Sequence, residues 1–138
     1  MKYFFAAVTA LGVIAIAVIC VRGNARGEVC REFLLRYGWE TEPQCTDHSE
    51  VYIPLIFDEV YKGYNEMQKE AGLDLLPYRG QSGERYTFII KNYPLDVGET
   101  VYANVICIDN APVAGDIMTV SARGFMHSLS SDPSGNGS

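Results

Sequence analysis

The sequence predicts an α+β domain in which a long amphipathic helix and a short N-terminal helix pack on one face of an antiparallel sheet. Two observations carry this prediction: apolar residues recur every three or four positions through 54–71, and they alternate with polar residues through 85–92 and 100–109. Strands joined by short turns pair antiparallel, and their apolar face needs a cover. We therefore expect a sheet of three to four strands, behind an N-terminal transmembrane helix.

Length and charge limit the domain count and the partners. The chain has 138 residues, 48% of them hydrophobic, and a domain takes roughly 100–200 residues. The net charge of −6 has the wrong sign for a protein that gains affinity by neutralising phosphates, so we expect no nucleic-acid partner. We predict one domain over residues 26–130, followed by a disordered Ser- and Gly-rich tail over 131–138.

An uncharged run at 3–21 follows Lys2 and precedes Arg22. About 20 apolar residues suffice to cross a membrane, whereas the apolar region of a signal peptide usually has about 7–15. The run therefore favours a single-pass anchor within residues 1–25 that contacts the cell membrane. Secretion after cleavage near Ala25 is the alternative. In both cases we expect the domain outside the cytoplasm.

The helices are placed by their start and stop residues. A short helix is expected over 29–37 because Gly38 follows it. A loop leads to a short strand at 50–53. Pro54 suits the first turn of the long helix, which we expect to end before Gly72. Its apolar stripe comprises Phe57, Val60, Tyr61, Tyr64, Met67 and Ala71.

The second half of the chain predicts strands. Alternating runs at 85–92 and 100–109 are two of them, and turn residues at 109–112 lead into a hairpin partner over 113–122. Residues 124–129 are expected to add a helical turn. The predicted order is helix, strand, long helix and then three strands in a meander.

Several segments of residues 31–129 resemble a known bacterial family. They are CREFLLRYGWE, YIPLIFDEVYKGYNEMQKEAGLDLLPYRG, KNYP, VAGDIMT and GFMHSL. The family is the uncharacterised domain of unknown function 4830. The resemblance implies an exported or membrane-anchored protein of a Gram-positive bacterium. It implies no activity and no catalytic residues.

Tyrosines and amides supply the candidate binding residues. Nine tyrosines occur in the chain, and tyrosine combines apolar area with a polar tip that suits a recognition surface. Packing of the domain itself uses tyrosine in the same way and stays open as the alternative. The candidate groove residues are Tyr64, Asn65, Gln68, Asn92 and Tyr93.

The cysteines suggest one disulfide. Cys30 and Cys45 lie at the start of the first helix and in the loop after it, from which the chain can double back. An oxidising compartment would allow a disulfide between them, and two free thiols are the other reading that the sequence leaves open. Cys107 lies in an apolar strand and is expected to be buried.

The chemistry-bearing residues are sparse. Cys107 with His127 could form a hydrolase pair, and Asp109 with Asp116 could act as paired carboxylates. No ligand spacing predicts a metal, and we expect no cofactor. The leading hypothesis is a non-enzymatic module that binds a protein or a cell-envelope component; a small enzyme is the alternative.

Overall fold

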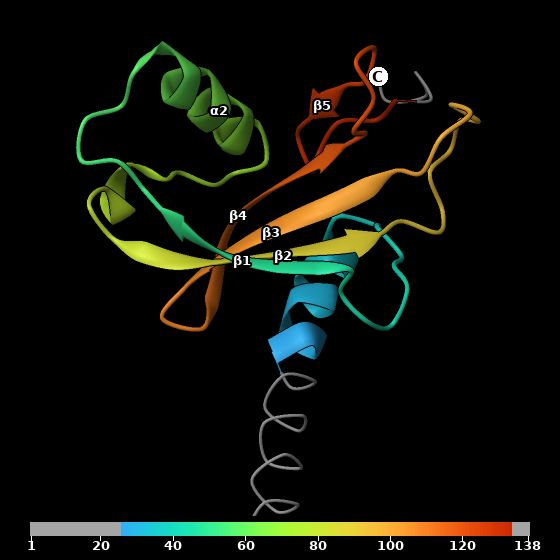
Figure 1. Cartoon of the computed structure of the whole chain (residues 1–138), viewed down its shortest axis with the longest axis horizontal. Helices are drawn as coiled ribbons and strands as arrows, with labels where there is room; N and C mark the ends of the chain where they lie inside the picture. Colours follow the sequence, from blue (N-terminus) through green and yellow to red (C-terminus); the bar gives the residue numbers. More distant parts are fainter. Residues whose placement is uncertain (1–25, 134–138) are drawn as a thin grey trace, which may run out of the picture.

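The computed structural model describes residues 26–133, and its centre is a five-stranded antiparallel sheet (Figure 1). The strands follow one another as a meander in the order β1-β2-β3-β4-β5. A tight turn joins only β3 to β4, whereas helix α2 (Glu59–Glu70) and η1 (Leu76–Tyr78) lie within the long connection between β1 and β2. The strands are β1 (Asp47–Tyr52), β2 (Ser82–Ile89), β3 (Tyr102–Ile108), β4 (Ala111–Met118) and β5 (Met126–His127).

A two-residue turn joins β3 to β4. Asp109 and Asn110 adopt φ values of 50° and 64°, in the left-handed region that Asp and Asn tolerate better than most residues. Ile108 pairs with Ala111 directly beyond them, so the turn sets the register at this end of the hairpin, and the register shifts between Cys107 and Ile106. The predicted turn at this position is confirmed.

The two helices lie on opposite faces of the sheet, so the prediction that both pack on one face is wrong (Figure 1). The first helix covers 26–36 in the described chain, and its residues join a large apolar core with one face. Helix α2 (Glu59–Glu70) contacts the other face and β4. Side chains alternate along each strand, and this sheet carries buried apolar residues on both faces, so each face has a cover of its own. The first core contains, among others, Phe33, Leu34, Trp39, Phe88, Val105 and Ile117.

The predicted strand number is also wrong, because the sheet has five strands rather than three to four. The additional strand is β5, where the sequence predicts a helical turn over 124–129. Two residues are too few to show an alternation, which explains why the pattern does not indicate a strand. β5 pairs only with Ile117 and Met118, so most of the outer edge of β4 stays beyond its reach.

Helix α2 begins later than predicted. Asp58 is its N-cap, and the Asp58 carboxylate accepts a hydrogen bond from the Tyr61 amide. Residues 54–57 therefore form a loop in place of a first helical turn. The buried side chains of α2 are Asn65 and Gln68, whereas Val60 of the predicted apolar stripe is exposed.

The predicted N-terminal segment, residues 1–25, lies outside the described part of the chain, and of the predicted tail over 131–138 only residues 131–133 are described. Within 26–133, neither helix combines the length and the apolar character that crossing a bilayer would require. The structure thus gives the predicted transmembrane helix no support, and the fold class is corrected to two helices on a five-stranded sheet.

Candidate functional site

The five residues predicted to form one groove lie in two separate parts of the domain. Tyr64, Asn65 and Gln68 belong to α2, whereas Asn92 and Tyr93 follow β2. In residues 26–133 no hydrogen bond or ring contact joins the two groups. The α2 group is described first, because it determines the shape of the surface beside it.

Gln68 is fully buried and pairs with the backbone of β4. The side-chain Nε2 donates to the Gly115 carbonyl at 2.8 Å, and Oε1 accepts from the Gly115 amide at 2.9 Å. The two bonds satisfy the backbone groups on the β4 edge where β5 does not reach. Gly115 fits this crowded place because an added Cβ would lie 2.7 Å from the Asn104 carbonyl oxygen.

Asn65 is buried and fixes the chain that leaves α2. Its Nδ2 donates to the Asp74 carboxylate at 2.8 Å, and its Oδ1 accepts from the Leu75 amide at 2.7 Å. The hydrogen bond from Asn65 Nδ2 lowers the pKa of Asp74, together with the hydrogen bond from the Leu76 amide. Asn65 therefore positions the 3₁₀ turn η1 (Leu76–Tyr78) against the helix.

Tyr64 ends a chain of hydrogen bonds across three strands. Its hydroxyl donates to Asp116 at 2.6 Å, Asn104 donates to the same carboxylate at 2.9 Å, and Thr87 donates to Asn104 at 2.7 Å. Burial raises the pKa of Asp116, although both donated hydrogen bonds oppose that shift. Burial also raises the pKa of Tyr64 well above its usual value. The network links α2 to the centre of the sheet.

Asp116 is expected to make folding stability depend on pH. Its raised pKa means that the folded state holds the proton more tightly than the unfolded state. The contribution of Asp116 to stability therefore increases as pH falls from its folded pKa toward the unfolded value. Urea unfolding of the wild type and of Asp116→Asn across pH 4–7 measures this. The wild type should gain stability relative to the variant toward low pH, and a constant difference would contradict the assignment.

Asn92 and Tyr93 hold the segment after the first helix. Asn92 accepts from the Glu40 amide at 2.9 Å and donates to the Gly38 carbonyl at 2.9 Å. Tyr93 stacks on Trp39 with 5.8 Å between ring centroids. Its hydroxyl lies 2.9 Å from His127 Nε2, so this pair fastens β5 to the loop after β2.

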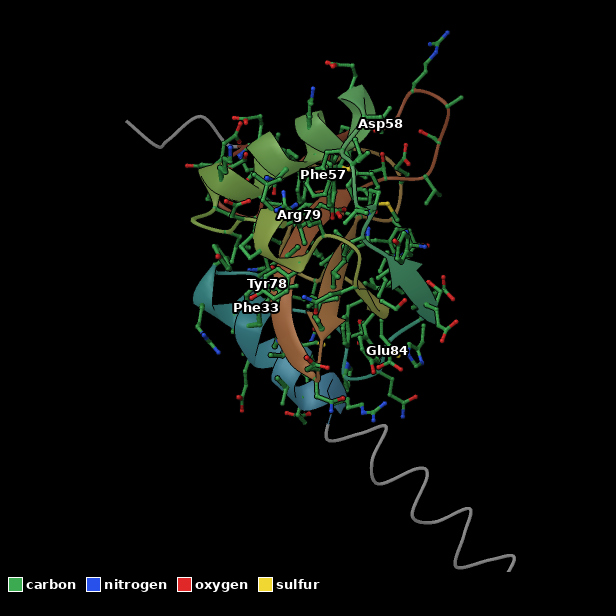
Figure 2. All side chains as sticks on the ribbon, turned by 90° about the vertical axis from the view of Figure 1, so that its left-hand side faces the viewer. Phe33, Phe57, Asp58, Tyr78, Arg79 and Glu84 are labelled. Atoms are coloured by element: carbon green, nitrogen blue, oxygen red, sulfur yellow. The ribbon has the colours of Figure 1, made fainter. Side chains whose placement is uncertain are left out.

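An open groove of about 370 Å³ lies between α2, the loop before it and η1. Asn65 is the one predicted binding residue that lines it. Figure 2 shows Phe57 and Arg79 at this surface, with Asp58 above them at the start of α2. The remaining lining residues are apolar or charged: Leu55, Ile56, Lys62, Glu66, Lys69 and Leu76.

The apolar wall of the groove faces solvent. Leu55 and Ile56 are 64% and 84% exposed, and Leu76 beside them is also exposed. A single exposed aliphatic side chain is ordinary, but several gathered at one place on a small domain are typical of an interaction surface. The groove is therefore the site that the described residues support best.

The charges of the groove are mostly paired within α2. Lys62 lies 3.4 Å from Glu59, and Lys69 lies 3.2 Å from Glu66. Arg79 differs, because its guanidinium forms no ion pair or hydrogen bond with any residue in 26–133. It leaves a cation at one end of the apolar wall.

The predicted catalytic pairs are not brought together. His127 pairs across the sheet with Ile117, which pairs with Ala103, so four residues of β3 separate Cys107 from this row. At roughly 3.3 Å per residue this is about 13 Å. Asp109 lies in the exposed hairpin turn, while Asp116 is buried. In the described residues no group of three or more His, Cys, Asp and Glu side chains could hold a metal ion.

The cysteines differ from the predicted pairing. Cys30, Cys45 and Cys107 are all free thiols, and Cys45 is exposed whereas the other two are buried. The neighbour of Cys30 is Cys107, with 3.6 Å between the sulfur atoms. The burial predicted for Cys107 agrees with its 5% exposure.

The sequence pattern does not predict the groove residues, because Pro54 favours a helix start before them. The consecutive run Leu55, Ile56 and Phe57 carries the signal that could have found them. Three adjacent residues point in directions about 100° apart on a helix, so they cannot all face one core. Arg79 carries no such signal in the sequence.

Comparison with known proteins gives a family and no named relative. No curated protein and no solved structure matches the chain. The family described as Domain of unknown function (DUF4830) matches residues 33–117, which include most of the first core, α2 and most of the sheet. The resemblance seen in the sequence is confirmed, and the chain belongs to the DUF4830 family.

Proposed function

We propose that this chain acts outside the cytoplasm as a non-enzymatic interaction domain that binds a segment of another protein in the groove beside α2. The observation that carries the proposal is the exposed apolar wall formed by Leu55, Ile56 and Leu76. The uncharged run at 3–21 supports export, because such runs are typical of export signals. The separation of Cys107 from His127 favours binding over hydrolysis.

The partner is a peptide segment rather than an anionic envelope polymer. A polymer of repeated negative charges requires several free cations, but Lys62 and Lys69 are paired with carboxylates of their own helix. Of the three cations that line the groove, Arg79 is the one without a carboxylate partner in residues 26–133. The groove thus fits a segment that inserts an aliphatic side chain against Ile56 and places one carboxylate beside Arg79.

Selection from a displayed peptide library on the full-length protein tests this function. We expect enriched peptides to share an aliphatic residue near an Asp or Glu. Ile56→Glu and Arg79→Glu should each weaken their binding at least about tenfold, because they remove an apolar contact and reverse the paired charge. Affinity is read by calorimetry or fluorescence anisotropy.

Leu95→Glu is the matched control, since Leu95 is 47% exposed in the loop between β2 and β3. This variant should bind the selected peptides as the wild type does. Equal binding by Ile56→Glu, or enrichment of peptides without the shared pattern, would refute the proposal. Sedimentation of the free protein completes the test: a dimer abolished by Ile56→Glu would assign the groove to a second copy of the chain.

A further inference from the structure

Two buried thiols meet between the first helix and the sheet. Cys30 of the helix and Cys107 of β3 are 1% and 5% exposed, and their sulfur atoms lie 3.6 Å apart although 77 positions separate them in sequence. No disulfide joins them. Within residues 26–133, the sulfur contact is the hydrogen bond that joins this helix to β3.

We propose that Cys30 and Cys107 form a disulfide that fastens the first helix to β3, with a low-molecular-weight disulfide such as oxidised glutathione as the oxidant. The sulfur atoms must approach by about 1.5 Å to reach bonding distance, from 3.6 Å to about 2.05 Å. Rotation of the two side chains about their Cα–Cβ bonds supplies movements of this size. The proposal is independent of the groove.

The disulfide forms by thiol–disulfide exchange in two steps. The Cys107 thiolate attacks one sulfur of oxidised glutathione, which forms a mixed disulfide and releases one glutathione thiolate. Cys30 then loses its proton to solvent and attacks the Cys107 sulfur, which forms the internal disulfide and releases the second glutathione thiolate. The two protein thiols are oxidised, and the two electrons reduce the glutathione disulfide.

The surroundings favour Cys107 as the first nucleophile. The contact between the two sulfur atoms lowers the pKa of Cys107 and, together with burial, raises that of Cys30. The thiolate is the attacking species, so the thiol with the lower pKa reacts first. Cys45 is exposed in a loop, and neither a hydrogen bond nor a disulfide joins it to Cys30.

The test refolds the full-length protein in a mixture of oxidised and reduced glutathione, so that burial does not limit access. Peptide mapping without reductant should yield a Cys30–Cys107 cross-linked peptide. The melting temperature should rise by about 10 °C or more over the reduced protein, because the bond closes a long loop. Reductant should reverse both changes.

Cys45→Ser is the matched control and should retain the cross-link and the rise in melting temperature. Cys107→Ala should lose both. A cross-link from Cys30 to Cys45 or to Cys20 would overturn the proposal. So would a folded protein in which Cys30 and Cys107 stay reduced after refolding in this mixture.

Discussion

Replacing Gln68 by alanine is expected to lower the free energy of unfolding by about 3–5 kcal/mol. The change removes both hydrogen bonds to Gly115 and leaves a buried amide and a buried carbonyl without partners. Each unsatisfied buried group costs about 1–3 kcal/mol, and the lost side-chain volume adds to this. For a domain of this size the loss is a large fraction of the whole stability. Urea unfolding followed by circular dichroism measures it.

Lys69→Ala is the control for this prediction, since Lys69 occupies the next position of α2 but is exposed. Its removal should cost less than about 1 kcal/mol, as for most surface ion pairs. A loss after Gln68→Ala as small as that after Lys69→Ala would show that the Gly115 contacts do not hold α2 on the sheet. The helix would then have to be fixed mainly by Tyr64 and Asn65.

Trp39→Ala is expected to destabilise the domain by about 3–5 kcal/mol, in the range for large aromatic residues in a core. Trp39 is buried, stacks on Tyr93 and donates its indole N–H to the Leu129 carbonyl at 2.8 Å. Its removal leaves a cavity and detaches the chain after β5 from the first core. Thermal unfolding followed by circular dichroism measures the loss.

Trp39→Phe separates the two contributions. Phenylalanine retains an aromatic ring but lacks the N–H donor, so this variant should lose about 1–3 kcal/mol for the unpaired Leu129 carbonyl and the smaller ring. Equal losses in the two variants would mean that the hydrogen bond dominates. A negligible loss in both would contradict the role of Trp39 in the core.

The pattern of neighbouring residues predicts the strands. It does not predict which face of the sheet each helix covers. The alternation through β2 and β3 reflects the two faces of the sheet, and Asp109 and Asn110 carry their own turn preference. Such signals lie within a few residues. Whether α2 and the first helix share a face of the sheet depends on contacts between distant segments. The spacing of apolar residues along the sequence does not indicate such contacts.

The candidate site shows the same division. The sequence identifies the α2 amides as a special group, but Asn65 and Gln68 bind the domain's own backbone. A single sequence does not distinguish a buried amide from an exposed one, because the residue type is the same in both cases. The groove itself depends on where α2 begins, and Asp58 competes with Pro54 for that start by accepting the Tyr61 amide.

The pairing of Gln68 with Gly115 also affects whether a second copy of this chain can associate through the open edge of β4. An open strand edge offers unpaired amides and carbonyls on which a second chain can add a strand, and soluble proteins obstruct such edges. β5 pairs only with the last residues of β4. The Gln68 side-chain amide makes the two hydrogen bonds at Gly115 that a neighbouring strand would make. One side chain of α2 therefore both attaches the helix and occupies the β4 edge at Gly115, where a further strand could otherwise pair.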